Sequence, residues 1–510
     1  MSMDNEVPPE VISFFRSSYC VIDSVQDVRS AQHLMLMATV RVLPFPPSVS
    51  SLSVDDVEAL NFRQKIIQQQ LQDSDDNGCV RIMLRVWKGS GSWWNFNRSS
   101  TSSCDIATLA IREVSAYLAA RQILLLVDND ASSGVTVPQL LHFSHSNDRL
   151  SQKALLDNID NDHNSTYWAA LSYHGESSFY FQQRNQQRQK YHDRGSFTNQ
   201  MITVREEFGF SEPHPRHGRV SVDKALPYAL KILDHVVLPI HMYLFRRHFW
   251  FPKDQATRED VLSPLIRKLS CKDGKPYCYK KMLQKYKEIY QILSLSREMK
   301  VGNNSVNPEG WEDNRRLQQI VGTLHLCIQQ LEQEYVGWES SFTSQLPPVL
   351  CHCDLQPQNI IFWTEDPITD DDPSDNRLLR NYIPNVACVL DWEEAAWADP
   401  RFELILLCRK ICANMDQATA VWLHYSSSIQ QWGAIHDVQH MIKIGPMDPW
   451  LKLEAVHSLT IFLLQTINLS GRGAQWERNQ DLLSKMEREL SRLSILGWSF
   501  CTNSTCSADK

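Results

Sequence analysis

The chain has 510 residues and a formal net charge of −8, with 43% hydrophobic and 22% charged residues. These proportions are those of a globular protein, and the length exceeds what one ordinary hydrophobic core accommodates, so two or more lobes are expected. The acidic balance argues against nucleic-acid binding as the main purpose of the protein.

The sequence contains no recognisable export or membrane-spanning segment. Residues 1–11 are acidic and lack the apolar core of a secretory signal. The most apolar stretches, 226–245 and 459–467, are interrupted by polar residues or are too short to span a bilayer. The 13 cysteines follow no repeating pattern. We therefore expect a reduced, soluble, cytoplasmic protein that does not act at a membrane.

The first third of the chain shows mainly strand patterns. Residues 31–45 fit either a helix that runs into a strand or two strands. Polar and apolar side chains alternate over 79–89, which predicts a half-buried strand. Apolar residues at helical spacing predict a helix over 105–127. Two further strands are predicted over 137–145 and 165–175.

Long helical patterns begin near residue 225, and two of them cover 450–467 and 476–493. Strands before about residue 175 and helices after it predict an α+β protein with segregated elements. We expect a small β-rich lobe over 1–172, whose residues 1–78 are poorly assigned, and a large helical lobe over 173–510. The polar, Gln- and Arg-rich stretch 182–194 has only its composition to suggest a role, such as an arm that docks a protein partner.

The most informative stretch is VLCHCDLQPQNIIFW, residues 349–363, which holds Asp354 and Asn359 between two apolar runs. A second apolar run, VACVLDW, ends near Asp391 after an acidic, Pro-containing loop over 364–385. Two strands at these places can pair as a hairpin with a long connection. That pairing would bring the three oxygen-bearing side chains to one end of the hairpin.

Phosphoryl transfer needs a set of this kind. One carboxylate orients the attacking hydroxyl and accepts its proton, while an Asn and a second carboxylate hold magnesium on the phosphates. Because most of the catalysis is positioning and charge neutralisation, a rigid loop between apolar strands is a suitable mount.

These residues also carry a resemblance to a known family. HCDLQPQNIIF is similar to the HGDLHPGN loop of aminoglycoside phosphotransferases and choline/ethanolamine kinases, and VLDWEEAAWADPRFEL resembles the motif that follows it there. The resemblance implies a bilobal protein-kinase-like fold and ATP- and Mg²⁺-dependent transfer of the γ-phosphate to a hydroxyl of a small molecule. Asp354 matches the catalytic Asp, His352 the His that braces the loop, and Asn359 and Asp391 the magnesium ligands. Glu403 stands where the family usually has a structural Asp.

The first lobe carries weaker matches. Residues 82–89 resemble the choline kinase strand on which a basic residue contacts the nucleotide phosphates. Arg85 is the match and Lys88 the competitor; the two face opposite sides of a strand, so only one can point at the nucleotide. Glu113 matches the Glu that pairs with that basic residue. The alternative interpretation is that Arg85 and Glu113 form a surface ion pair, which would contribute little to stability or function.

Other features depart from the family pattern. No glycine-rich phosphate loop precedes residue 79, the loop Gly is replaced by Cys353, and a later small residue is Gln358. These departures motivate an alternative function, a pseudokinase or nucleotide-binding interaction module without turnover. Choline-like, sugar-like and aminoglycoside-like acceptors all remain open, and so does the oligomeric state.

The motif residues also admit simpler interpretations. The three oxygen-bearing side chains can be polar caps at strand ends. Cys351, His352 and Cys353 invite a zinc site, but alternation along a strand directs the cysteines one way and the His the other. No CxxC pair lies near them, so zinc is disfavoured.

Overall fold

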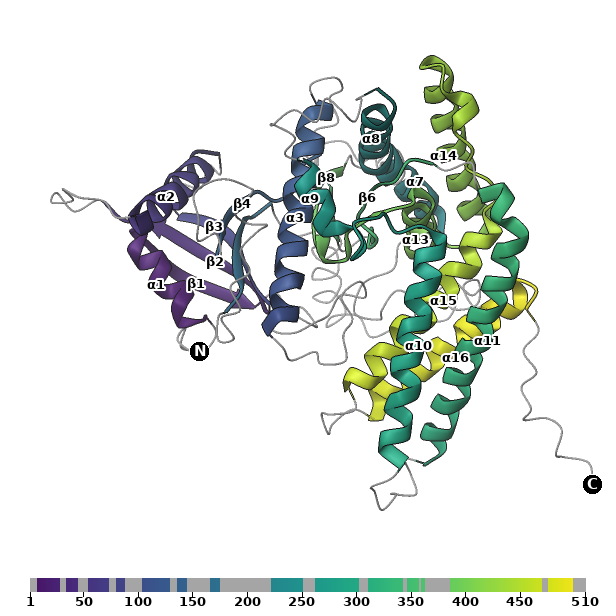
Figure 1. Ribbon diagram of the computed structural model, residues 1–510. Coiled ribbons are helices and arrows are strands. Elements are labelled where there is room, and N and C mark those ends of the chain that lie inside the picture. The colour runs from purple at the N-terminus through teal and green to yellow at the C-terminus, as the bar shows by residue number, and fades with distance from the viewer. Residues whose placement is uncertain are drawn as a thin grey trace, which may run out of the picture. The chain divides into compact units, whose positions relative to one another are not determined.

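The computed structural model describes residues 7–27, 34–44, 54–72, 79–87, 103–128, 135–144, 166–174, 222–250, 262–301, 311–342, 346–356, 359–362, 386–469 and 476–498. The chain divides into two compact units. The first consists of Met1–Glu176, Lys253–Leu269 and Ala387–Ala395, and the second of Ser177–Pro252, Ser270–Val386 and Ala396–Lys510. The predicted α+β class is confirmed, because the first unit holds a sheet and the second is largely helical (Figure 1).

The first unit is built on a five-stranded antiparallel sheet. Its strands, in spatial order, are β1 (Cys20–Asp27), β2 (Leu34–Val42), β3 (Cys79–Val86), β5 (Trp168–Ser172) and β4 (Leu140–Phe143). Arg85 of the central strand lies opposite Met35 on one side and Ala169 on the other. In the stretch 31–45, the described residues 34–44 contain one strand, β2, with neither the helix nor the second strand that were expected there.

Two helices cover one face of this sheet. They are α1 (Pro9–Ser17) and α2 (Val54–Gln72), and Phe15, Phe62 and Ile66 pack against the apolar side chains of β2 and β3. The second half of α2, residues 63–72, is polar and rich in Gln. Because Gln residues predominate there, the few buried apolar residues that pack α2 on the sheet give only a weak helical pattern in the sequence.

The segment that carries Asp391 belongs to the first unit, where hydrogen bonds to its main chain hold it on both sides. Strand β8 (Val386–Val389) exchanges hydrogen bonds with Thr136, whose N–H donates to the Ala387 carbonyl at 2.8 Å and whose carbonyl accepts the Val389 N–H at 3.0 Å. Arg112 of helix α3 (Ser103–Asp128) donates to the Ala395 carbonyl at 2.9 Å. The short 3-10 helix η7 (Trp392–Glu394) lies between these two anchors.

Arg112 also ties helix α9 (Leu262–Leu269) to α3, because its guanidinium donates to the Leu269 carbonyl at 3.2 Å. The apolar side of α3 packs with Trp87 and Phe143 in a second core. The predicted strand and helix over 79–89 and 105–127 therefore form and lie next to each other in the first unit.

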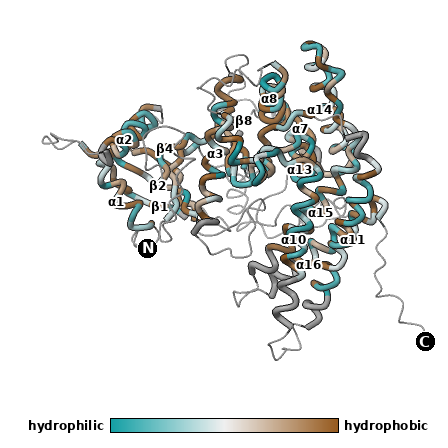
Figure 2. The backbone as a smooth tube through the Cα atoms, in the orientation of Figure 1, coloured by the Kyte–Doolittle hydropathy of each residue, from teal (hydrophilic) through white to brown (hydrophobic). Residues whose placement is uncertain are grey.

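The second unit consists mainly of helices, together with short strands. Its elements are α7 (Val222–Ile232), η3 (Leu233–Val237), α8 (Leu238–Trp250), α10 (Tyr279–Val301), α11 (Trp311–Phe342), β6 (Val349–Cys351), β7 (Ile360–Phe362), β9 (Ala396–Ala398), α13 (Pro400–Ile411), α14 (Met415–Ile435), η8 (Gln439–Met441), α15 (Asp448–Leu469) and α16 (Trp476–Ile495). The helices alternate hydrophilic and hydrophobic colours along their length, as amphipathic helices do (Figure 2). Among the described residues, no helix is long and apolar enough to cross a membrane.

A buried ion network fixes α13 to the two last helices. Arg409 of α13 pairs with Glu454 of α15 at 3.3 Å and with Glu489 of α16, and Arg492 of α16 pairs with the same two carboxylates. All four side chains are almost fully buried, and two positive charges balance two negative ones. Breaking such a group leaves an uncompensated buried charge, so the network holds α13 in one place. Helix α13 carries the residues that contact the loop around Asp354.

Candidate active site

The loop around Asp354 begins at the end of a buried strand. Val349 and Cys351 of β6 pair with Ala398 and Ala396 of β9. Two residues later Cys353 has a φ of 63°. This left-handed conformation costs a residue other than Gly about 1–2 kcal/mol, which gives a physical reason for Gly at this position in the similar motif.

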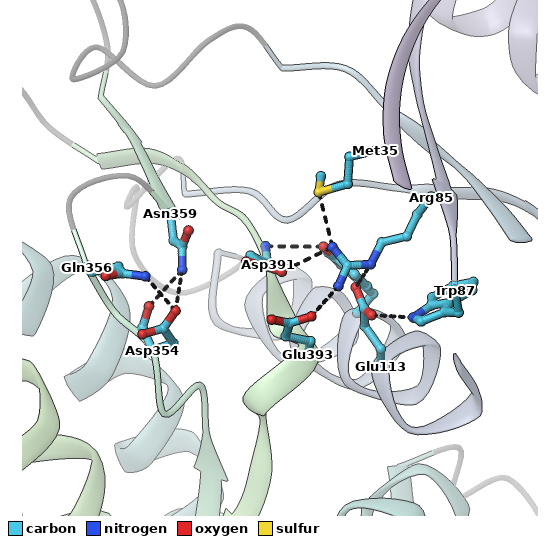
Figure 3. Close-up of polar contacts among 10 residues, drawn as sticks. Met35, Arg85, Trp87, Glu113, Asp354, Gln356, Asn359, Asp391 and Glu393 are labelled. Carbon is cyan, nitrogen blue, oxygen red and sulfur yellow. Dashed lines mark hydrogen bonds and ion pairs between the residues drawn. The ribbon is translucent and has the colours of Figure 1, made fainter. Parts of the chain in front are cut away.

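Asp354 is surrounded by hydrogen-bond donors from its own loop (Figure 3). Its Oδ2 accepts from Gln356 Nε2 at 2.7 Å and from Asn359 Nδ2 at 2.9 Å, and Asn359 Nδ2 also donates to the Asp354 carbonyl at 3.0 Å. The amide oxygen of Asn359 is directed away from Asp354 (Figure 3). Two residues that the motif marks therefore lie together in the second unit.

The other carboxylate oxygen, Asp354 Oδ1, forms an ion pair with Lys410 Nζ at 3.0 Å. Lys410 comes from the last turn of α13, and the sequence analysis did not single it out. Only one feature of the sequence points to Lys410. It lies seven residues after Glu403, which is two turns further along the same helix.

His352 and Glu403 contact the loop backbone rather than the Asp354 carboxylate. His352 Nδ1 accepts the Asp354 N–H at 3.2 Å, and Glu403 Oε2 accepts the Cys353 N–H at 2.7 Å. Helix α13, which supplies Glu403, begins with Asp399 as its N-cap, whose side chain accepts the Arg401 N–H at 3.0 Å. A capped helix thus holds the left-handed turn in place.

Burial raises the pKa of Glu403 to about 8. The N–H groups of Cys353 and His352 counteract this rise, and the nearby charge of Asp354 adds to it. The Glu403 carboxyl is therefore mainly protonated below pH 8 in the folded protein.

This shifted pKa predicts a pH-dependent effect of Glu403→Gln on stability. An exposed Glu in the unfolded chain has a pKa of about 4.3. Between that value and 8 the folded state keeps a proton that the unfolded state has lost, so rising pH lowers the free energy of unfolding of the native chain. The Gln variant lacks this loss and should gain on the native chain by up to about 1.4 kcal/mol per pH unit.

Urea unfolding of both proteins at several pH values between about 5 and 8 measures the difference. Glu332→Gln, which changes an exposed carboxylate paired with Lys287, is the matched control and should show no such trend. Parallel stability curves for Glu403→Gln and the native chain would contradict the assignment.

The first unit holds a second polar cluster, centred on Arg85 (Figure 3). The Arg85 side chain is 1% exposed, and its nitrogens face Glu113 at 2.9 Å, Asp391 at 3.3 Å and Glu393 at 2.5 Å. Glu113 also accepts the Trp87 Nε1–H at 2.7 Å. The structure therefore brings Arg85, Glu113 and Asp391 together and excludes the surface ion pair as an explanation. Glu393 is a member of the cluster that the sequence analysis missed, and Lys88 lies outside the described residues.

The charges in this cluster do not balance. One guanidinium faces three carboxylates, which leaves a formal charge of −2. Burial by itself would lower the pKa of Arg85, but the carboxylates of Glu113, Glu393 and Asp391 outweigh it and hold the pKa above its ordinary value. An excess of negative charge around side chains that are still partly exposed favours an added cation.

Asp391 has a fixed backbone conformation. Its φ is 59° and ψ is 65°, a left-handed geometry that Asp and Asn tolerate better than other non-Gly residues. Its N–H donates to the Tyr117 hydroxyl at 3.2 Å. The Asp391 carboxylate therefore projects from a turn whose backbone is constrained.

Two side chains that the motifs name carry oxygen donors of the kind that Mg²⁺ prefers. Asn359 of the second unit has an amide oxygen, and Asp391 of the first unit has a carboxylate oxygen. Within the part of the chain that the structure describes, no group of three or more His, Cys, Asp or Glu side chains is arranged to hold a metal ion. Cys351 and Cys353 are free cysteines.

Comparisons with known proteins give structural similarity alone. No protein-family model matches the sequence, and no curated protein matches it. Solved structures similar to this chain include the GDP and kanamycin complex of APH(2")-IIia, with 12% identity, 96% of this chain and 99% of that chain covered, and a TM-score of 0.40.

Two further structures are also similar. Spectinomycin phosphotransferase APH(9)-Ia, in complex with ADP and spectinomycin, has 12% identity, 96% and 92% coverage and a TM-score of 0.39. Choline kinase from Cryptosporidium parvum has 10% identity, 96% and 95% coverage and a TM-score of 0.37. They belong to the kinds of enzyme that the two motifs resemble. Because every TM-score is below 0.5, the functional assignment rests on the residues of this chain.

Proposed function

We propose that this chain is an ATP- and magnesium-dependent phosphotransferase that transfers the γ-phosphate to a hydroxyl of a small molecule. The observation that supports it most is the pair formed by Asp354 and Asn359. The Asn359 amide nitrogen donates to the Asp354 carboxylate, and its amide oxygen is directed away from Asp354. This arrangement suits Asp354 as the group that accepts a proton and Asn359 as a ligand of a metal ion.

In the proposed reaction Asp354 orients the acceptor hydroxyl and takes its proton. A bond forms between the hydroxyl oxygen and the γ-phosphorus, the bond to the β–γ bridging oxygen breaks, and ADP leaves. Gln356 and Asn359 hold the carboxylate in one rotamer, while His352 and Glu403 hold the loop backbone. Such positioning is the main contribution that a protein makes to this chemistry.

Asn359 and Asp391 are the proposed magnesium ligands. Magnesium would supply neutralisation of the phosphate charge. The formal charge of −2 around Arg85 supports a cation at Asp391, since a divalent ion there would balance the cluster.

Arg85 and Glu113 are the proposed nucleotide-binding pair. The Arg85 side chain is 1% exposed, and each of its three nitrogens faces a carboxylate. A phosphate can therefore reach the guanidinium only if the more exposed Asp391 or Glu393 side chain moves away. Without that movement, Arg85 would contribute to nucleotide binding only indirectly, by holding the Asp391 carboxylate in position. The direct phosphate contact stays a prediction.

The same cluster adds support for the alternative function, a nucleotide-binding module without turnover, which the departures from the family motif also motivate. A buried guanidinium that already pairs with three carboxylates is a poor phosphate ligand. A module of this kind would bind ATP but transfer phosphate to no acceptor, so one assay separates the two functions.

That assay incubates the purified protein with [γ-³²P]ATP, magnesium and a deproteinised pool of cellular metabolites, and then separates labelled products. The proposal predicts labelled phosphate esters that form with the protein and disappear when EDTA replaces magnesium. ATP that binds without labelling any compound would favour the module without turnover.

A further inference from the structure

The charge beside the proposed catalytic carboxylate is positive, and it does not belong to the buried ion network. Arg409 and Lys410 are neighbours on α13, but Arg409 is buried against Glu454 and Glu489. Lys410 points to the loop instead, where it contacts Asp354 and keeps 34% of its side chain exposed. Helix α13 therefore places the Arg409 guanidinium in the core and the Lys410 ammonium at the candidate site.

The hydrogen bonds of Asp354 determine which of its oxygens an acceptor can reach. Oδ2 already accepts from the two side-chain amides of Gln356 and Asn359. Oδ1 is paired with Lys410 alone among the described residues. A hydroxyl that approaches Asp354 therefore meets Oδ1, and its neighbouring atoms come near the Lys410 ammonium.

A lysine ammonium has three N–H donors, so it can bind a second anion while it stays paired with Asp354. At separations of a few ångströms and the reduced dielectric of a protein surface, this ammonium repels a cationic group and attracts a carboxylate or phosphate. His457 adds no positive charge near Lys410. Burial is the main cause that lowers the pKa of His457 to about 4; the charge of Glu454 opposes this shift and the charge of Lys410 adds to it, so the imidazole is neutral at pH 7.

We propose that the acceptor is a hydroxyl compound that carries an anionic group, and that Lys410 binds this group. The inference rests on the proposed function, because it specifies the acceptor of the same reaction. It narrows the three acceptor classes by disfavouring choline-like and aminoglycoside-like cations. The products are ADP and a phosphate ester that keeps its carboxylate or phosphate.

The experiment uses acceptors that share a carbon skeleton and differ in charge. One series is glycerate, glycerol 3-phosphate, glycerol and 3-amino-1,2-propanediol, and the other is gluconate, glucose 6-phosphate, glucitol and glucamine. Comparison of the carboxylate compound with the phosphate compound in each series shows which of the two anionic groups the protein prefers. Transfer from [γ-³²P]ATP to each compound is compared between the native chain, Lys410→Gln, Lys410→Arg and Lys410→Glu.

The native chain and Lys410→Arg should favour an anionic member over the cationic member of its series by about tenfold or more in kcat/KM, as expected for an ion pair to a partly buried lysine. Lys410→Gln should reduce this ratio to within about threefold, and Lys410→Glu should reverse it. Lys281→Gln removes an exposed lysine paired with Asp273 in the same unit and should leave the ratio unchanged.

A preference of the native chain for the cationic members would overturn the inference, and so would an unchanged ratio in Lys410→Gln. Binding of MgATP, measured by thermal shift, without transfer to any anionic member would also overturn it while the nucleotide site remained. Failure to bind MgATP would instead overturn the proposed function itself.

Discussion

The Asp354→Asn variant is expected to lose phosphate transfer while it keeps its fold and its nucleotide binding. Asn has nearly the same shape, and its oxygen can still accept from Gln356 and Asn359, so the loop should remain in place. The variant loses the ion pair between Asp354 Oδ1 and Lys410, whose side chain is 34% exposed and can turn to solvent. It also lacks a group that takes the hydroxyl proton. Removing such a group lowers the rate by about 10²–10⁴-fold.

Label transfer to the metabolite pool measures this loss, with the variant and the native chain at equal concentration. Asp273→Asn, a change at an exposed carboxylate paired with Lys281 in the same unit, should transfer at the native rate. Transfer by Asp354→Asn within a few-fold of the native rate would show that Asp354 is not the proton acceptor.

The Arg85→Met variant is expected to destabilise the first unit by about 3–5 kcal/mol. Methionine fills much of the same space, but it leaves the fully buried Glu113 and two further carboxylates without their cation. The cost comes from the uncompensated charges, so it should be partly recovered when Glu113→Gln is added to Arg85→Met. Chemical denaturation of the single and double variants gives the coupling energy.

The first unit offers a matched control on the neighbouring strand. Arg41 of β2 pairs with Asp23 at 2.9 Å, but its side chain is 55% exposed. Arg41→Met should therefore cost only about 0–1 kcal/mol. An Arg85→Met variant as stable as Arg41→Met would contradict the account of the cluster, and so would a cost that Glu113→Gln does not reduce.

Local patterns in the sequence predicted much of the fold. The alternation over 79–89 and the helical spacing over 105–127 correspond to β3 and α3, because both signals come from neighbouring residues along one element. The patterns over 450–467 and 476–493 likewise correspond to α15 and α16. Helix α2 was not predicted, because only a few of its residues are apolar and buried and many of the others are Gln.

The candidate site was predictable only where its residues share a motif. Asp354 and Asn359 lie five positions apart on one loop, so the motif contains their contact. Lys410 and Glu393 meet their partners from 56 and 308 positions away along the chain. Such pairings depend on how α13 and the segment Ala387–Ala395 pack, which no local periodicity encodes.

The central claim is that Asp391 serves a magnesium–nucleotide complex, and thermal unfolding with ATP tests it most directly. The midpoint is measured with ATP alone and with ATP and magnesium, for the native chain and Asp391→Asn. Asn tolerates the left-handed φ of 59° at this position, so the variant changes the ligand charge with little effect on the backbone. Asp23→Asn, which changes a surface carboxylate of the same unit, is the control.

MgATP at a hundred times its dissociation constant should stabilise the native chain by about 2.7 kcal/mol. The account predicts that magnesium increases the shift seen with ATP, that Asp391→Asn loses this increase and that Asp23→Asn keeps it. Equal magnesium-dependent shifts in the native chain and Asp391→Asn, or no shift at all with saturating MgATP, would contradict it.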